Sequence, residues 1–254
     1  MDGVQLTAGE KTLVVLEKAI EHRRFTDIVA ATGLAKATVH RILGTLVERG
    51  FLAPTPEGDY LPGPRFLSLT GRAFEEIDIA RLVEPLAADL ASQVHCTVHV
   101  GARVGDEVVY LVRADSDKPY RMPSRVGATI PMNTSGIGKS ILAQVEDSEV
   151  MLYASRAGLV RRTARTLSTV EDLLAELHDV RREGFSFDRE ENVPGVVCIA
   201  APIWDHTGRC MYGLSISTLA LEHDEDQLRA MAPELLTTAA AMSAVLGGAA
   251  PSHP

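Results

Sequence analysis

A glycine-rich run, "NTSGIGKS" at residues 133–140, contains the residue types that bind phosphate. In the nucleotide-binding pattern G-x-x-x-x-G-K-[ST], backbone N–H groups surround the phosphates and a lysine, here Lys139, reaches the terminal ones. Asn133 stands where the pattern requires its first glycine. The run "IAAPIWD" could pass for the apolar strand that ends in a magnesium-binding aspartate, but Pro202 within it suits an edge strand. Nucleotide hydrolysis through Lys139 is therefore the alternative function. The broader expectation is that a glycine-rich turn leading into a helix presents free N–H groups to a small anion.

A pair of serines, Ser215 and Ser217, offers a second way to bind an anion. They are two residues apart in the apolar run 209–217, so on a strand both hydroxyls point to one face, while Leu214 and Ile216 point to the other. Two hydroxyl donors on one face suit a carboxylate. The ordinary alternative is that such hydroxyls bond the backbone within the sheet.

The histidines and cysteines predict no metal site. The run "HCTVH" places His95 and His99 on one face of a predicted strand and Cys96 on the other, which is poor geometry for three ligands. The cysteines number three and lack C-x-x-C spacing, which favours reduced thiols over a disulfide framework or a zinc site. We expect no metal and no cofactor, and no sequence signature supports a Cys–His nucleophilic pair.

Composition and charge narrow the class of protein. The 254 residues are 46% apolar, enough for one sizeable core or a core plus a small module, and the chain contains neither a signal-peptide pattern nor 18 consecutive apolar residues. We therefore expect a cytoplasmic protein that does not enter the membrane. Residues 66–254 carry the whole net charge of −9, while residues 23–50 hold five basic and two acidic residues. A small basic segment on an acidic body is compatible with a DNA-binding head.

The first 65 residues have the order of a winged helix-turn-helix. Thr7 and Glu10 have capping-box spacing at the start of a helix that should end near residue 24, and a short helix at 27–31 leads to a turn at Gly33. A second helix is expected over 36–49, followed by a two-stranded hairpin in "PTPEGDYLPG". In this motif the second helix lies in the major groove. Its exposed face would carry the base-contacting candidates Lys36, Thr38, His40 and Arg41.

Two features keep the alternatives to DNA binding open. Helix-turn-helix geometry also occurs in protein-interaction domains, and the same polar residues could simply be the solvated face of a small bundle. Ala35 stands where Ser or another capping residue would start the recognition helix better. A sensor with a protein partner in place of DNA is therefore a third possible function.

The remaining sequence predicts an α+β domain with a mainly antiparallel sheet. A connecting helix over 66–81 precedes a domain at 82–248 and a tail at 249–254. Strands are expected as hairpins with helices inserted between them, and a capping box at Ser168 and Glu171 should start one of these helices. The strands are expected at 96–114, as a hairpin, and at 120–125, 195–203 and 209–217. The helices are expected at 138–144, 148–156, 168–183 and 225–246, the last either kinked or restarted at Pro233.

Four stretches together resemble the IclR family of bacterial transcriptional regulators. They are "TGLAKATVHRILGTLVERGFL", "GDYLPG", "RVGATIPMNTSGIGKSILA" and "GFSFDREENVPGVVCIAAPIWDHTGRCMYGLSIS", of which "DREENVPGVVCIAAPI" is the most specific. The resemblance spans nearly the whole chain. It implies a winged-helix head, a linker helix and a GAF-like effector-binding domain, in a homodimer or homotetramer that binds double-stranded DNA at a pseudo-palindromic operator.

The resemblance also implies where a small organic-acid effector binds. The family's pocket positions fall on Gly136, Ile137, Asp188, Cys198, Ser215 and Ser217, with Ile137 larger than the small residue that many relatives carry. From the residues alone, Asp188 could accept a hydroxyl of the ligand or fix the loop, or be only a capping or turn residue, and Cys198 would be a small core residue. Met122 and Met132 are further candidates for apolar neighbours that select the effector by size. We therefore expect a ligand-responsive transcriptional regulator and not an enzyme.

Overall fold

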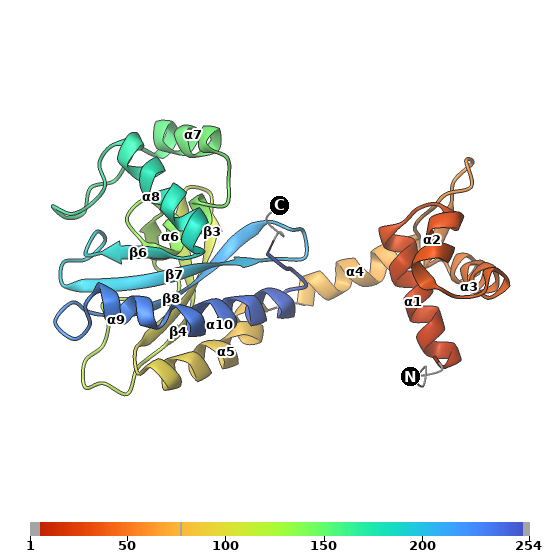
Figure 1. The fold of residues 1–254 in the computed structure, drawn as a ribbon, viewed down its shortest axis with the longest axis horizontal. Helices are drawn as coiled ribbons and strands as arrows, with labels where there is room; N and C mark the ends of the chain where they lie inside the picture. The colour runs from red at the N-terminus through yellow and green to blue at the C-terminus, as the bar shows by residue number, and fades with distance from the viewer. Residues whose placement is uncertain (1–5, 77, 251–254) are drawn as a thin grey trace. The chain divides into compact units, whose positions relative to one another are not determined.

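The computed structural model describes residues 6–76 and 78–250, the side chains of 71–76 excepted. The chain forms two compact units that divide between residues 77 and 78 (Figure 1). Of the expected tail, residues 251–254 lie outside the described ranges. Within those ranges no helix is long and apolar enough to span a membrane.

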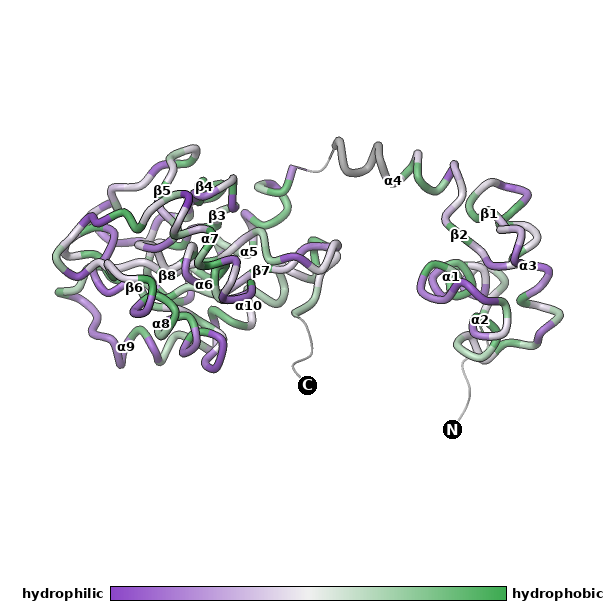
Figure 2. The backbone as a smooth tube through the Cα atoms, turned by 90° about the horizontal axis from the view of Figure 1, so that it is seen from above, coloured by the Kyte–Doolittle hydropathy of each residue, from purple (hydrophilic) through white to green (hydrophobic). Residues whose placement is uncertain are grey.

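The first unit is a winged helix-turn-helix followed by one more helix. Its elements are α1 (Ala8–Glu21), α2 (Phe25–Thr32), α3 (Lys36–Glu48), the antiparallel strands β1 (Leu52–Pro54) and β2 (Tyr60–Pro62), and α4 (Pro64–Glu76). The predicted capping box of Thr7 and Glu10 starts α1, and Gly33 ends α2 at a φ of 64°. Along α1, α2 and α3 hydrophilic and hydrophobic residues alternate, as in helices that bury one face (Figure 2). The buried faces meet in a core that includes Val15, Ile28, Val39, Leu43 and Leu46.

The second unit is a six-stranded sheet with helices on both faces. The strand order is β5-β4-β3-β8-β7-β6 and every neighbouring pair is antiparallel, which confirms the predicted α+β class. The strands are β3 (Thr97–Val104), β4 (Glu107–Ala114), β5 (Thr129–Pro131), β6 (Ser186–Arg189), β7 (Val196–Trp204) and β8 (Cys210–Leu219). The helices are α5 (Ile79–Val94), α6 (Gly136–Leu142), α7 (Asp147–Ala157), α8 (Val170–Glu183), α9 (Glu225–Ala230) and α10 (Ala232–Val245).

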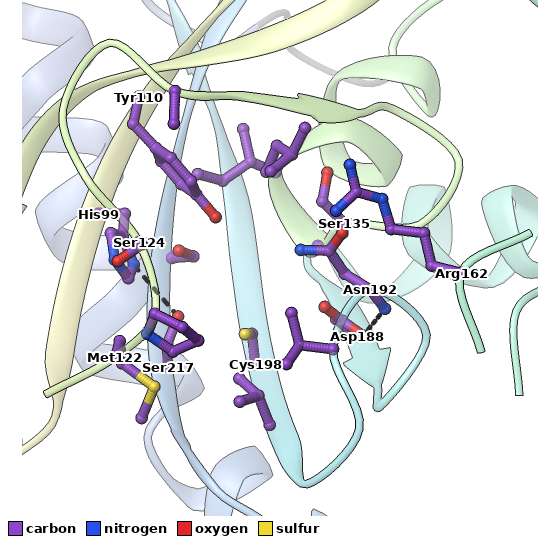
Figure 3. Close-up of a pocket in the computed structure, with 18 of the residues that line it drawn as sticks. His99, Tyr110, Met122, Ser124, Ser135, Arg162, Asp188, Asn192, Cys198 and Ser217 are labelled. Atoms are coloured by element: carbon purple, nitrogen blue, oxygen red, sulfur yellow. Dashed lines mark hydrogen bonds between the residues drawn. The ribbon is translucent and has the colours of Figure 1, made fainter. Parts of the chain in front are cut away.

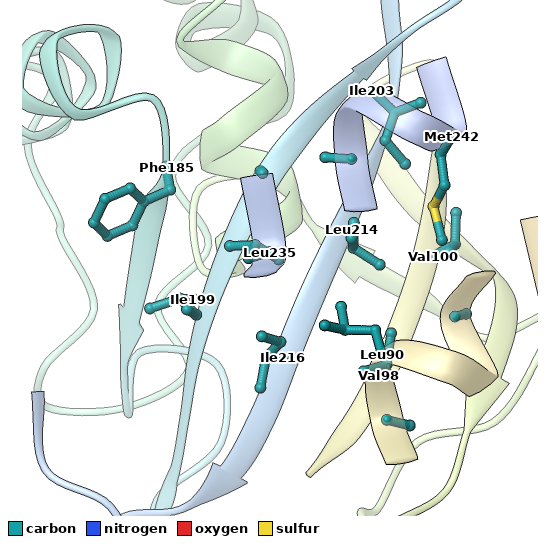
Figure 4. Close-up of a cluster of buried hydrophobic side chains, with 14 of the residues drawn as sticks. Leu90, Val98, Val100, Phe185, Ile199, Ile203, Leu214, Ile216, Leu235 and Met242 are labelled. Carbon is teal, nitrogen blue, oxygen red and sulfur yellow. The ribbon is translucent and has the colours of Figure 1, made fainter. Parts of the chain in front are cut away.

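Two cores lie on opposite faces of this sheet. On one face α5 and α10 pack against inward side chains such as Val98, Ile199, Leu214 and Ile216 (Figure 4). On the other face α6, α7 and α8 form a second core with Val108, Ala200 and Trp204 among its sheet residues. Since Leu214 and Ile216 of β8 face the first core, the side chains that alternate with them face the α6 side. Because side chains alternate between the two faces of a strand, only every second residue of β8 faces the α6 side of the sheet.

Four expectations about local structure were wrong. Residues 120–125 form a loop, because Pro123 cannot donate to a sheet, and the strand lies later, at β5. Strand β6 was not predicted, since four residues are too few for a clear alternation. His95 is the left-handed C-cap of α5 at a φ of 52° and is not on a strand. Helix α8 is capped by Thr169, whose hydroxyl accepts from the N–H of Asp172, one residue beyond the predicted box.

Candidate functional site

A cavity of about 150 Å³ opens on the α6 face of the sheet. Strands β3, β4, β7 and β8 supply its floor, the start of α6 one wall, and the loops 115–128 and 190–195 much of the rest. In Figure 3, His99, Ser124 and Ser217 lie on one side, Asp188 and Asn192 on the other, and Cys198 between them. Polar groups from distant parts of the chain therefore converge on one pocket that also has apolar lining residues such as Ile130 and Ile137, the usual form of a small-molecule site.

The structure brings the six predicted effector residues together. Two wall residues come from α6 and one from β6, while the floor residues come from β7 and β8. Met122 also lines the pocket, whereas Met132 is buried in the core beneath α6 and does not. The six lining residues are Gly136, Ile137, Asp188, Cys198, Ser215 and Ser217.

The glycines of α6 serve close packing. A Cβ on Gly136 would lie 3.1 Å from the Cβ of Ala200, and one on Gly138 would lie 2.2 Å from the carbonyl oxygen of Met132. The hydroxyl of Ser135 accepts from the N–H of Gly138 at 3.1 Å and so caps the helix. Small residues therefore let the first turn of α6 sit directly on the sheet, where Ser135, Gly136 and Ile137 line the pocket.

Lys139 does not point to a phosphate site. Its side chain is fully buried, and its Nζ lies 2.5 Å from Oε1 of Glu191 and 3.3 Å from Oε1 of Glu176. A lysine held by two carboxylates inside the protein cannot extend to the phosphates of a nucleotide. The nucleotide-hydrolase alternative is therefore not favoured, and Lys139 has a structural role.

Asp188 both shapes a turn and faces the pocket. Its Oδ1 accepts from the N–H of Glu191 at 2.7 Å and from that of Asn192 at 3.3 Å, as the turn interpretation expects. Burial, partly offset by the Glu191 N–H bond, raises the pKa of this carboxyl to about 7. Burial also raises the pKa of the Cys198 thiol, and the charge of Asp188 adds to that shift. The thiol is thus neutral and unsuited to nucleophilic attack.

Several pocket residues were missed or misassigned. His99, which the sequence offers as a candidate metal ligand, lies in the floor of the pocket with its ring 4.8 Å from that of Tyr110. On the neighbouring strands β3 and β8, His99 pairs with Ser215, and this pairing would have assigned His99 to the pocket. Which strands are neighbours cannot be inferred from the sequence. Arg162 and Asn192 come from loops and carry no periodic signal. Across the described residues no cluster of three metal-ligating side chains occurs.

The predicted DNA-contacting face lies on α3. Lys36, His40 and Arg41 are exposed and Thr38 is half-buried, while the opposite side of the helix enters the core. As its sequence suggested, Ala35 provides no side-chain cap. The Lys36 ammonium instead lies 5.8 Å from the centre of the Phe25 ring, so α2 helps to position the start of the helix.

A helix-turn-helix head and a separate ligand-sized pocket define a DNA-binding regulator with a sensor domain. Residues 11–56 match the IclR helix-turn-helix domain, and residues 71–244 match the C-terminal domain of the bacterial transcriptional regulator IclR. The chain therefore belongs to the IclR family of DNA-binding transcriptional regulators.

Individual relatives agree with this assignment. The transcriptional regulator KdgR of Escherichia coli is 32% identical over 240 residues, covering 93% of this chain and 91% of KdgR. The regulator XynR of the same organism is 30% identical, covering 94% and 96%. The crystal structure of the Agobacterium tumefaciens repressor BlcR superposes with a TM-score of 0.74 at 25% identity, covering 94% and 96%.

Proposed function

We propose that this regulator senses a small carboxylate in the pocket on the α6 face and changes its operator affinity in response. The observation that carries the proposal is the convergence of the Ser215 and Ser217 hydroxyls with the first turn of α6 on one cavity. Hydroxyl and N–H donors bind a carboxylate by charge-assisted hydrogen bonds. The helix end adds roughly 0.3–1 kcal/mol at an exposed site and up to about 2 kcal/mol when partly buried.

The size of the cavity limits the effector. A cavity of 150 Å³ is comparable in volume to one that holds benzene, so a compact ligand of about six non-hydrogen atoms fits in it. Ile137 and Met122 are the apolar neighbours that would select for size. Arg162 at the pocket wall is exposed and offers a positive charge to the entering acid.

The operator-binding form is proposed to be a homodimer or homotetramer. A single winged helix contacts only a few base pairs, so useful specificity requires two heads on a pseudo-palindromic site with half-sites about 10 base pairs or a multiple apart. Lys36, Thr38, His40 and Arg41 of α3 are the proposed contacts. We assign residues 1–65 to the head, 66–81 to the linker and 82–248 to the sensor, acting on DNA in the bacterial cytoplasm.

The test measures coupling between ligand and DNA. Operator fragments selected from a random-sequence pool are titrated by fluorescence anisotropy at fixed salt, with and without each member of a panel of small carboxylates. A true effector should change the affinity by about 5-fold to 150-fold. If carboxylates leave operator affinity unchanged, while a cation or a nucleotide changes it, the assignment of the pocket is wrong.

A further inference from the structure

His99 connects the floor of the pocket to the loop that covers it. The residue is on β3, is only 2% exposed, and uses both ring nitrogens. Its Nδ1 lies 3.2 Å from Oγ of Ser217, and its Nε2 lies 2.7 Å from Oγ of Ser124 in the loop 115–128 (Figure 3). One ring therefore joins a proposed effector-binding serine to a serine of the covering loop.

The ring is neutral at physiological pH. Burial lowers the pKa of His99 to about 4, with the Arg113 guanidinium as the next cause and the Asp115 carboxylate acting in the opposite direction. A neutral imidazole has one N–H donor and one acceptor nitrogen. One of the two serines must therefore donate to the ring, while the other accepts from it.

The two distances differ in the way that the two kinds of hydrogen bond do. Hydroxyl donors make short bonds, at about 2.7–2.8 Å to an oxygen acceptor, whereas N–H···O bonds are commonest at about 2.9–3.0 Å and extend to about 3.2 Å. The short contact fits Ser124 donating its O–H to Nε2, and the long one fits Nδ1–H donating to Ser217. The backbone carbonyl of Ser124 accepts from Nη1 of Arg113, which holds this serine in place.

The direction of these bonds decides what Ser217 offers to a ligand. If Ser217 accepts from Nδ1–H, its own hydrogen stays available. A neighbouring group for that hydrogen is the sulfur of Cys198, a weak acceptor that a carboxylate would readily replace. In the opposite tautomer the hydrogen of Ser217 would be directed to the ring, and its lone pairs would repel an anion.

We infer that His99 is a positioning residue that, as its Nδ1–H tautomer, fixes Ser217 as a hydrogen-bond donor. The pocket thereby selects a ligand with an acceptor group at this point, and the chain Ser124–His99–Ser217 links that group to the covering loop. The identification of the acceptor as a carboxylate rests on the proposed function. The bond directions do not, because they depend only on the protein.

Beside Ser124, the loop residues Met122, Pro123 and Ala128 line the pocket. Met122 is 4% exposed and Ser124 is half-buried, whereas Arg121, Pro123 and Arg125 are exposed. A ligand that engages Ser217 polarises the connected hydrogen bonds and so strengthens the hold on Ser124. His99 therefore couples occupancy of the pocket to the order of its cover.

The first test reads the tautomer directly and needs no ligand. Solid-state NMR of the full-length protein with ¹⁵N-labelled histidine distinguishes the two neutral tautomers and the imidazolium, and the His99→Asn variant identifies the His99 signal among the eight histidines. We expect a neutral ring protonated at Nδ1 at pH 7.5. Protonation at Nε2, or an imidazolium, overturns the inference. In Ser124→Ala we expect Nε2 to lose its donor, so that its ¹⁵N signal moves while Nδ1 stays protonated, and an unchanged Nε2 signal also overturns the inference.

The second test compares two amide replacements of His99 by calorimetry with acetate, propionate and lactate, and with lactamide as an uncharged control. Asn places its amide where Nδ1 was and can still donate to Ser217, whereas Gln places it where Nε2 was. With the tightest-binding acid, His99→Asn should stay within about fivefold of the wild-type affinity and His99→Gln should lose more than tenfold. Equal losses, or the reverse order, in variants with wild-type thermal melting contradict the inference. If the wild type binds none of the acids, the carboxylate proposal fails, and the NMR result still decides the tautomer.

Discussion

Replacing Lys139 by alanine should strongly lower the free energy of unfolding of the sensor domain, because the lysine neutralises a buried acid. Its Nζ lies 2.5 Å from Glu191, whose side chain is 4% exposed and whose Oε2 is buried without a hydrogen-bond partner. The second partner, Glu176, is 19% exposed and also binds Arg189 at 3.0 Å. Glu191 is therefore the group that alanine leaves buried and uncompensated.

The expected loss is large and depends on pH. Removing one partner of a buried ion pair costs about 3–5 kcal/mol of the free energy of unfolding. Burial already raises the pKa of Glu191, and the Lys139 ammonium, which lowers it, is absent from the variant. A carboxyl whose pKa is higher in the folded than in the unfolded state makes stability fall as pH rises above the unfolded value of about 4.3. The deficit of the variant should thus be smallest near pH 5 and largest near pH 8.

Urea unfolding followed by tryptophan fluorescence measures this deficit. Trp204 is the single tryptophan and lies in the same buried cluster as Ile141 of α6, so it reports the sensor domain alone. The matched control is Lys118→Ala, which removes a more exposed lysine 3.8 Å from Glu222 and should cost about 0–1 kcal/mol.

Two outcomes decide the reasoning. Lys139→Met combined with Glu191→Gln should recover most of the stability, because neither charge then remains. A loss below about 1 kcal/mol in Lys139→Ala, or a deficit that does not shrink toward pH 5, would refute the role of the buried pair. Turnover of ATP that disappears in Lys139→Ala would instead revive the nucleotide-hydrolase alternative.

Three further predictions test the two domains. Arg41→Ala should cost about 1–3 kcal/mol of specific operator affinity, since arginine can bond guanine at two positions, and unchanged binding at fixed salt contradicts the assignment. Replacing both Ser215 and Ser217 by alanine should abolish the response to a carboxylate and leave ligand-free operator affinity nearly intact; a normal response in the double variant counts against the pocket. Because burial raises the pKa of Asp188 to about 7, wild-type stability should fall as pH rises from about 4 to 7, and Asp188→Asn should show a smaller fall between pH 5 and 8 in urea unfolding.

Local features of both domains were predictable from the sequence. The capping box at Thr7, the stop at Gly33 and the restart of the last helix at Pro233 depend only on near neighbours and on the backbone geometry of single residues. The alternation in β8 likewise fixed that Ser215 and Ser217 share a face. The resemblance to a family then supplied the positions of the pocket, which spacing alone could not.

Only the tertiary structure decided which distant residues meet. His99 reaches Ser217 over a separation of 118 residues because β3 pairs with β8, and Lys139 meets Glu191 over a separation of 52. The spacing of "SGIGKS" could therefore suggest a phosphate-binding lysine when the lysine is in fact held by a buried acid. The spacing of hydrophobic residues determines the face on which a side chain lies, but strand order and register determine its partner. Strand order and register depend on how the whole sheet packs against the helices on its two faces.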